Sequence, residues 1–395
     1  MKCLLNLMKG ASLAAALFIF PACRESADAM VDRVFDVALS RYTSMDEALT
    51  TLTLPRTAQA DSLVLCKPSW WTSGFYPGSL WYIYLKTSDP GILALAEKNT
   101  RKVYAETQAA RSHDIGFVTN CSYGNALRFT ADTIWRQPVI DAARALCRRY
   151  SPVTGAIRSW DFSRGGKTWL YPVIIDNMMN LELLMEAYRL SGTDSLRAIA
   201  VAHAHTTLKN HFRSDCSSYH VVDFDPADGS VRSKCTLQGY SDDSAWARGQ
   251  SWGLYGYTMM FRESGEKVFL DVAEKIAGFI IPRLPADGIP YWDYDAPDIP
   301  DAPRDASAAA IMASALLELS AYTENKGSAQ LYRRTALKQL RTLSGPGYLA
   351  ASGENCNFLL KHCVGNLPAG SEVDVPLSYA DYYFLEALLR LRGLL

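Results

Sequence analysis

The sequence predicts an all-α protein in which six helical hairpins stand in a ring. Apolar residues recur at spacings of three and four over about twelve stretches, and few alternating runs are long enough for strands. Short breakers such as 191–194 separate several neighbouring helices, as in tight antiparallel hairpins. Longer segments rich in aromatic residues, Gly and Asp precede every second helix.

The helices are expected in pairs along the chain. The first helix of a pair follows an aromatic segment, and the second follows a short polar turn. No exact internal repeat accompanies this alternation. The expected spans are 27–43, 78–88, 91–107, 122–132, 134–150, 177–191, 194–211, 243–262, 265–281, 305–323, 326–342 and 378–393.

The aromatic segments predict where a ligand would bind. In a ring of hairpins, the N-termini of the six inner helices converge on one mouth. Helix N-termini carry unpaired amide donors and partial positive charge, so this mouth would favour an anion. The segments that would surround it are 70–78, 113–117, 171–177, 238–255, 290–297 and 372–379.

Length and charge limit the class of protein. The 395 residues contain no linker-like run, which predicts a single domain over 24–395. The formal net charge is −1, with 40 Lys and Arg against 41 Asp and Glu. The basic surface of a nucleic-acid-binding protein is therefore not expected, and an anionic ligand must be held by a local arrangement of residues.

The N-terminus is typical of an export signal. Residues 1–23 have a short basic lead, an apolar stretch too short for a convincing membrane span, and a small residue before Cys23. Cys23 resembles the acceptor of a bacterial lipoprotein, although Phe20 and Pro21 depart from that pattern. We expect an exported protein, periplasmic or anchored in the membrane of a bacterium, that contacts the membrane only through a lipid at Cys23.

The cysteines and histidines do not indicate a metal site. Cys216 with Cys235, or Cys356 with Cys363, could form disulfides, and buried thiols are the alternative. None lies in a compact metal-binding spacing with histidines. The pair at 203 and 205 lacks the four-residue spacing that would bring two imidazoles together on a helix. No metal is expected.

Two aspartates are candidates for acid/base chemistry. Asp114 and Asp176 are each expected at the mouth end of an inner helix. Two carboxyl groups facing one cavity suffice for acid/base work on a sugar if one of them is kept protonated. The apolar residues 173–175 would desolvate Asp176 and raise its pKa. The alternative is that each aspartate merely caps its helix.

Aromatic rings and polar donors near these aspartates predict a cleft for an acidic sugar. Flat rings stack on sugar faces, and amide or guanidinium groups hold a carboxylate. Core packing is the alternative for any one ring. His220 precedes the 238–255 segment on a short alternating run, and a satisfied core histidine is its alternative. The other candidates are Trp70, Trp71, Tyr240, Trp246, Trp252, Trp292, Gln238 and Arg248.

Several stretches match one enzyme family in order along nearly all of the chain that follows the export signal. They are 71–81, 113–117, 121–125, 175–180, 238–250 and 305–308. In these stretches the chain resembles the unsaturated glucuronyl hydrolases of glycoside hydrolase family 88. The resemblance implies an (α/α)6 barrel of six helical hairpins, which agrees with the ring expected from the helix pattern.

The resemblance also implies a reaction. These enzymes remove the 4,5-unsaturated uronic acid that a polysaccharide lyase leaves at the non-reducing end of an oligosaccharide. The vinyl ether is hydrated, and the hemiketal opens and expels the remaining sugar. Asp176 matches the general acid/base, and Asp114 matches the aspartate that orients the ring and stabilises positive charge. One proton activates an enol ether, so no cofactor is implied. The matching sugar-binding positions are Trp71, His220, Gln238, Trp246, Arg248 and Trp252.

The C-terminal region limits the assignment of the substrate. Some members that act on sulfated glycosaminoglycan fragments carry a Ser and Lys cluster for the sulfate, and here only Lys361, His362 and Ser371 are candidates. A glycosaminoglycan fragment is the favoured substrate. Two alternatives stay open: an unsaturated rhamnogalacturonyl hydrolase acting on pectin fragments, and an exported acidic-sugar-binding protein without activity.

Overall fold

The computed structural model describes residues 25–163 and 166–395. The expected export signal at 1–23, with Cys23, lies outside the described residues. Within the described residues, no helix has the length and apolar character needed to cross a membrane.

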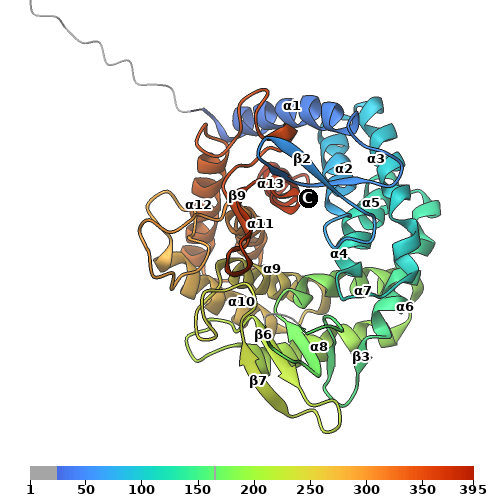
Figure 1. The fold of residues 1–395 in the computed structure, drawn as a ribbon, viewed down its shortest axis with the longest axis vertical. Helices are drawn as coiled ribbons and strands as arrows, with labels where there is room; N and C mark the ends of the chain where they lie inside the picture. The colour runs from blue at the N-terminus through green and yellow to red at the C-terminus, as the bar shows by residue number, and fades with distance from the viewer. Residues whose placement is uncertain (1–24, 164–165) are drawn as a thin grey trace, which may run out of the picture.

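Six helical units form a closed inner ring (Figure 1). Each packs against the next in chain order, and the last packs against the first. This arrangement confirms the ring of hairpins expected from the sequence. The inner units are α2 (Phe75–Thr87), α4 (Ile115–Thr119) with α5 (Asn125–Thr130), α7 (Asn177–Ser191), α9 (Ala247–Ser264), α11 (Ala306–Tyr322) and α13 (Ser378–Arg392).

Six outer helices surround this ring. Five of them pack against an inner helix that is next to them in the chain, and α1 packs against both α2 and α13. The helices therefore pair as hairpins, which makes the fold an (α/α)6 barrel. The outer helices are α1 (Ala27–Asp46), α3 (Pro90–Lys102), α6 (Arg136–Cys147), α8 (Asp194–His211), α10 (Lys267–Ile280) and α12 (Lys326–Leu343).

The side chains explain which helices lie inside. α11 is apolar on nearly every face, and almost all of its residues up to Leu319 are buried. Its partner α12 buries only one stripe, from Tyr332 to Leu343, and carries charged residues on the other face. A helix that is apolar all round must be enclosed, whereas an amphipathic helix covers a core and faces water.

One inner helix differs from its expected form. The span 122–132 belongs to a longer unit in which a π-helical turn, Asn120–Gly124, joins α4 to α5. The unit therefore begins earlier than apolar periodicity indicates, directly after Asp114. Close packing accompanies this arrangement: a Cβ atom on Gly74 would lie 2.4 Å from the carbonyl oxygens of Phe117 and Val118.

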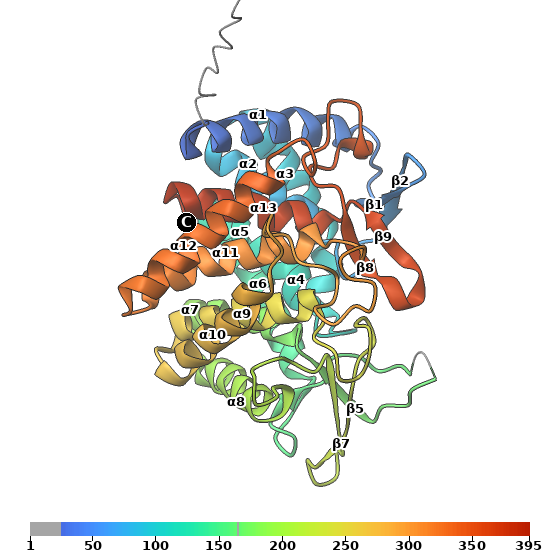
Figure 2. The same cartoon turned by 90° about the vertical axis from the view of Figure 1, so that its left-hand side faces the viewer.

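Four small antiparallel sheets were missed by the helix analysis. They are three hairpins and one three-stranded sheet in the order β5-β6-β7. Figure 2 shows that they gather on one side of the molecule. The strands are β1 (Leu54–Gln59), β2 (Ser62–Cys66), β3 (Tyr150–Ser151), β4 (Ala156–Ile157), β5 (Tyr171–Ile174), β6 (Val221–Phe224), β7 (Val231–Cys235), β8 (Cys363–Asn366) and β9 (Ser371–Val375).

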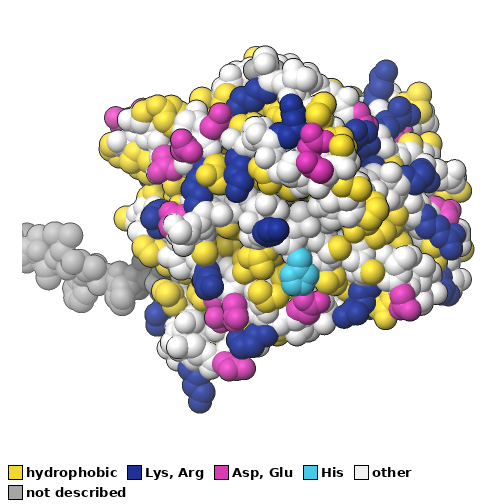
Figure 3. All heavy atoms as spheres, turned by 90° about the horizontal axis from the view of Figure 1, so that it is seen from below, with side chains coloured by type: hydrophobic (Ala, Val, Ile, Leu, Met, Phe, Trp, Pro, Cys, Tyr) yellow, Lys and Arg dark blue, Asp and Glu magenta, His cyan; other side chains and the backbone are white. Residues whose placement is uncertain are grey.

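The described chain has no disulfide, and the face of it shown in Figure 3 carries charges of both signs. All seven cysteines of the described chain are free thiols, so neither Cys216 with Cys235 nor Cys356 with Cys363 forms a disulfide. The face in Figure 3 mixes Lys and Arg with Asp and Glu, in keeping with the net charge of −1.

Candidate active site

A cavity of about 440 Å³ opens at the N-terminal ends of the inner helices. Loops before α2, α4 and α7 form one part of its wall, and β1, α9 and the β8–β9 hairpin form the rest. Both candidate aspartates therefore face one space. The lining residues are Arg56, Ser69, Trp70, Trp71, Ser112, His113, Asp114, Trp160, Phe162, Ile174, Asp176, Leu237, Gln238, Arg248, Gly365, Asn366, Ser371, Glu372 and Tyr379.

Asp176 occupies the N-cap position of α7, but its side chain accepts no capping hydrogen bond. Burial raises the pKa of Asp176 to about 7, although Arg248 lowers it and Asp114 adds a smaller rise. Its Oδ2 atom has no hydrogen-bond partner among the described residues. The carboxyl group is therefore part protonated near neutral pH, and no described residue forms a hydrogen bond with its Oδ2 atom.

His220 lies directly behind this carboxyl group, with Nε2 3.8 Å from Asp176 Oδ2. Its Nδ1 atom accepts hydrogen bonds from the backbone N–H groups of Leu237, at 3.1 Å, and Gln238, at 3.2 Å. Because Nδ1 accepts, the proton of the neutral ring resides on Nε2. Burial, followed by Arg248, lowers the pKa of His220 well below its usual value, so the ring is a neutral donor beside Asp176.

Asp114 occupies the N-cap position of α4 and likewise makes no capping hydrogen bond with its side chain. Instead, the Ser112 hydroxyl donates to Asp114 Oδ2 at 2.8 Å, and His113 Nε2 lies 3.4 Å from Asp114 Oδ1. The interpretation of Asp114 and Asp176 as simple helix caps is therefore wrong.

Arg248 is a buried cation in the cavity wall, with 1% of its surface exposed. Its guanidinium donates to the carbonyls of Val364 and Gly365 in β8, and to Asp305 Oδ2 at 3.3 Å. Its carbon centre lies 4.4 Å from the centre of the Trp246 ring. These contacts fix the Arg248 side chain in one conformation. Binding an anionic ligand therefore does not require this side chain to become ordered.

Gln238 and Trp71 also face the cavity, as expected. Gln238 donates through Nε2 to the Gly365 carbonyl at 3.1 Å, which orients the amide. The Trp71 ring packs against Phe117 and Tyr379, with ring centres 5.9 Å and 5.1 Å away. The wall thus combines an oriented amide with a supported aromatic face.

Three residues expected on the sugar surface lie behind it. His220, Trp246 and Trp252 are not among the lining residues of this cavity. The Trp246 ring packs 4.6 Å from the His220 ring, and Trp252 is fully buried against Phe117 and Tyr383. The expectation of direct contact is therefore corrected: these side chains support Asp176 and Arg248, because the inner helices enclose them on all sides.

Other residues at the cavity were missed from the sequence. Arg56 Nε donates to Glu372 Oε1 at 2.6 Å, which joins β1 to β9, and its guanidinium lies 4.3 Å from the centre of the Trp70 ring. Trp160 and Phe162 stack with ring centres 5.3 Å apart. Two aromatic residues two positions apart, at 160 and 162, were a signal for such a wall, whereas the pairing of residues 56 and 372 has no local signal.

The sulfate candidates do not lie together. Ser371 lines the cavity, but Lys361 and His362 do not. Lys361 donates to the carbonyl of Pro346, and His362 Nδ1 is 2.5 Å from Asp374 Oδ1. Of the three candidates for a sulfate, only Ser371 therefore faces the cavity that holds the two aspartates.

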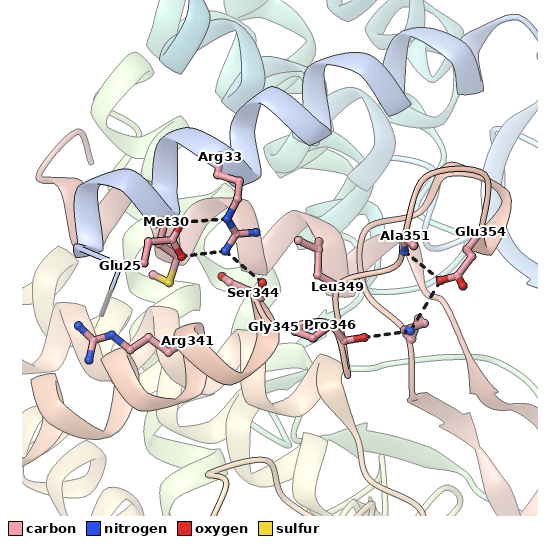
Figure 4. Close-up of a pocket in the computed structure, with 11 residues that line it drawn as sticks. Glu25, Met30, Arg33, Arg341, Ser344, Gly345, Pro346, Leu349, Ala351 and Glu354 are labelled. Carbon is pink, nitrogen blue, oxygen red and sulfur yellow. Dashed lines mark hydrogen bonds and ion pairs between the residues drawn. The ribbon is translucent and has the colours of Figure 1, made fainter. Parts of the chain in front are cut away.

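A second cavity, of about 620 Å³, lies between α1 and the loop after α12 (Figure 4). Its charged groups are largely paired with one another: Arg33 Nε with Glu25 at 2.9 Å, and Lys361 with Glu354 at 3.8 Å. It holds no pair of carboxyl groups without cationic partners, so it offers no acid/base chemistry of the kind found at the mouth.

No cluster of three or more His, Cys, Asp or Glu in residues 25–163 and 166–395 is arranged to hold a metal ion. The chemistry available to the described cavity is that of its two aspartates. One is part protonated near neutral pH, and the other accepts a hydrogen bond from Ser112 and lies 3.4 Å from His113 Nε2.

Comparison with known proteins gives consistent results. No family model matches the chain. An unsaturated glucuronyl hydrolase of Formosa agariphila is 46% identical over 328 residues, which cover 82% of this chain and 80% of that protein. The enzyme of the same name from a Bacillus species is 34% identical over 81% of this chain and 86% of its own length. An unsaturated chondroitin disaccharide hydrolase of Streptococcus pneumoniae is 33% identical over 81% of both chains.

Solved structures of unsaturated glucuronyl hydrolases share the fold of this chain. The crystal structure of an unsaturated glucuronyl hydrolase specific for heparin superposes with a TM-score of 0.89 at 45% identity, over 93% of this chain and 98% of that one. The Bacillus enzyme superposes with a TM-score of 0.85 at 31% identity, over 92% and 97%.

Proposed function

We propose that this chain, which belongs to the unsaturated glucuronyl hydrolases of glycoside hydrolase family 88, uses Asp176 and Asp114 to remove a 4,5-unsaturated uronic acid from the non-reducing end of glycosaminoglycan fragments. The observation that carries the assignment of residues is the buried Asp176 carboxyl, whose pKa is raised to about 7 in the same cavity as Asp114.

The proposed reaction begins with protonation of the alkene. Asp176 gives its proton to C4, and the electron pair of the C4=C5 bond forms the new C–H bond. Positive charge then develops at C5 and on the ring oxygen. A water molecule adds to C5 and returns a proton to Asp176. The resulting hemiketal opens, the C5–O5 bond breaks, and the hemiacetal left at C1 releases the remaining saccharide.

The other side chains bind and orient the sugar in this scheme. We assign to Asp114 the stabilisation of the cation formed at C5 by its negative charge. Arg248 and Gln238 supply a fixed cation and an oriented amide for the uronate carboxylate. Trp71 offers an aromatic face to the ring. His220, held as the Nε2–H tautomer, directs its N–H toward Asp176 from behind the cavity surface.

The choice of glycosaminoglycan fragments rests on the relatives. Their names include a chondroitin disaccharide hydrolase and an enzyme specific for heparin. An enzyme acting on pectin-derived rhamnogalacturonyl fragments is the second candidate, since it would need the same acidic pair.

The experiment is a panel of unsaturated disaccharides generated by lyases from heparin, chondroitin and pectin. The conjugated C4=C5 bond absorbs ultraviolet light, and hydration removes that absorbance. We expect loss of absorbance with heparin or chondroitin products and none with pectin products. Turnover of pectin products alone would assign the second candidate. Binding of any disaccharide without turnover would instead indicate an inactive sugar-binding protein.

We also propose that the chain is exported and anchored by a lipid at Cys23, on the strength of residues 1–23. In a bacterial host, the full-length protein should sediment with membranes, and the Cys23→Ala variant should move to the soluble fraction. Equal distribution of the two proteins would contradict a lipid at this position.

A further inference from the structure

A buried amide links the two helices that carry the aspartates. Asn180 lies on α7, one turn after Asp176, and its Oδ1 atom accepts a hydrogen bond from the backbone N–H of Phe117 on α4 at 2.8 Å. Its Nδ2 atom lies 3.2 Å from His113 Nδ1. The Phe117 N–H can only donate, so the amide oxygen must face it and the amide nitrogen must face His113.

This orientation determines the tautomer of His113. The Asn180 amide nitrogen can only donate, so His113 Nδ1 accepts and carries no proton. The ring is buried in the cavity wall, and burial lowers its pKa, so it stays neutral with its proton on Nε2. That nitrogen faces Asp114 Oδ1 at 3.4 Å, while the Ser112 hydroxyl donates to the other carboxylate oxygen at 2.8 Å.

The backbone is adapted to this contact. A Cβ atom on Gly116 would lie 2.4 Å from Asn180 Oδ1, so only glycine leaves room for the amide oxygen to reach Phe117. The same hydrogen bond holds α4 against α7, the helices that begin directly after Asp114 and Asp176. The amide therefore acts on the relative placement of both aspartates.

We propose that His113 is a positioning residue: its Nε2–H, oriented by Asn180, holds the Asp114 carboxylate in the direction that the reaction needs. The inference rests on the function proposed for Asp114. Asn177 and Arg149 also lie near the His113 ring, but Asp114 is the only carboxylate that His113 contacts within the described residues.

The test compares two replacements of similar size and shape. In His113→Gln, the side-chain amide places an N–H at about the position of imidazole Nε2, whereas His113→Met fills similar space without a donor. We expect His113→Met to lower kcat by about 10–100-fold, the usual effect of removing a group that orients a reacting side chain, with KM changed less than about threefold. His113→Gln should recover at least about a third of the wild-type kcat.

Thermal unfolding of both variants separates positioning from folding, because a purely structural role would lower activity and melting temperature together in both. Equal kcat values in the two variants, whether high or low, would overturn the proposal. Asp114→Asn serves as the control for the underlying function: wild-type turnover in that variant would remove Asp114 from the reaction itself, whatever the result at His113.

A second readout examines the ring directly. Nitrogen NMR of the protein labelled at histidine, with the His113 signals identified by their loss in His113→Gln, should show a neutral ring protonated at Nε2 at neutral pH. A ring protonated at Nδ1, or a doubly protonated ring, would overturn the assignment.

Discussion

The two ends of the barrel treat buried carboxyl groups in opposite ways. At the mouth, burial raises the pKa of Asp176 to about 7, and Arg248 offsets that rise only in part. At the floor, where the inner helices end, burial also raises the pKa of Glu318, but Arg390 and Arg262 more than reverse this effect and hold it at about 2. The same fold thus keeps one carboxyl ready to hold a proton and the other permanently charged.

The difference lies in the partners. Glu318 accepts a hydrogen bond from Arg262 Nη1 at 2.7 Å and another from Arg390. Asp176 has no comparable ion pair: its Oδ2 atom is without a partner in the described chain. The floor network, which lines a separate cavity of about 810 Å³, also contains Arg128, Glu182, Arg189, Glu263 and Glu386. Burial alone therefore does not decide the pKa of a carboxyl group: the pKa of Asp176 is raised because burial outweighs the effect of Arg248, and that of Glu318 is lowered because its arginines outweigh burial.

The largest effect is expected at the mouth. Asp176→Asn should lower kcat by about 1,000-fold or more, because the amide cannot give up a proton to C4. The fold should be retained, as judged by circular dichroism and thermal unfolding. Activity within tenfold of wild type would show that another group supplies the proton.

Asp176→Asn should also change how stability depends on pH. The folded-state pKa of Asp176 lies above its unfolded value, so its contribution to stability is fully present below about pH 4 and is lost as the pH rises through about 7. The loss is on the order of 4 kcal/mol in the free energy of unfolding. Urea unfolding at pH 4 and pH 8 should show this decrease in wild type. The variant should show a smaller decrease, because burial also raises the pKa of Asp381 to about 7 and that contribution remains.

Replacing a carboxyl group at the floor should lower stability and leave activity nearly unchanged. Glu318→Gln leaves Arg262 and Arg390 without their shared carboxylate and should lower the free energy of unfolding by about 3–5 kcal/mol. Its kcat/KM at a temperature where it is folded should stay within about threefold of wild type, since the floor does not contact the mouth. A large loss of activity without loss of stability would contradict this separation of roles.

The folded-state pKa of Glu318 lies below its unfolded value, so its stabilisation should disappear as the pH falls from about 4.5 through 2.

The alkaline pH dependence of activity should come from Asp176 at the mouth and not from Glu318 at the floor. Above about pH 7, Asp176 loses its proton, and kcat/KM should fall by about tenfold per pH unit. The Glu318→Gln variant should show the same alkaline decrease, because the pKa of Glu318 lies far below this range. A decrease that begins at a different pH in this variant would show that the two ends are coupled.

The smallest effect is expected at the rim of the mouth. Arg56 and Glu372 form an ion pair whose side chains are 25% and 15% exposed. Solvent screens such a pair, so Glu372→Gln should change the free energy of unfolding by about 1 kcal/mol or less. Glu97→Gln is the control. It breaks the ion pair between Glu97 and Arg101 on α3, which is more exposed than the pair at the rim, and should change the free energy of unfolding by less than about 0.5 kcal/mol. A loss of several kcal/mol at Glu372 would place the rim pair with the floor network.

The ring and the raised pKa at the mouth could be predicted from the sequence, because both depend on local patterns, whereas the floor network was not predicted. Helical periodicity and the aromatic segments predicted the ring, and the apolar residues before Asp176 correctly predicted that burial raises its pKa. Contacts between segments far apart in the sequence could not be predicted. Trp246 and Trp252 were expected to face the sugar, but only the closed ring shows that their rings are enclosed. Arg56 meets Glu372 across 316 positions, a pairing that no local pattern reveals.

The proton on Asp176 can be measured directly. Carbon NMR of the protein labelled at the aspartate carboxyl groups, with the Asp176 signal identified by its loss in Asp176→Asn, would follow its titration in the unliganded enzyme. We expect a midpoint near pH 7, with little change in Glu318→Gln. A midpoint below about pH 5 would contradict the assignment of Asp176 as the proton donor, because the carboxyl would then be charged throughout the neutral range.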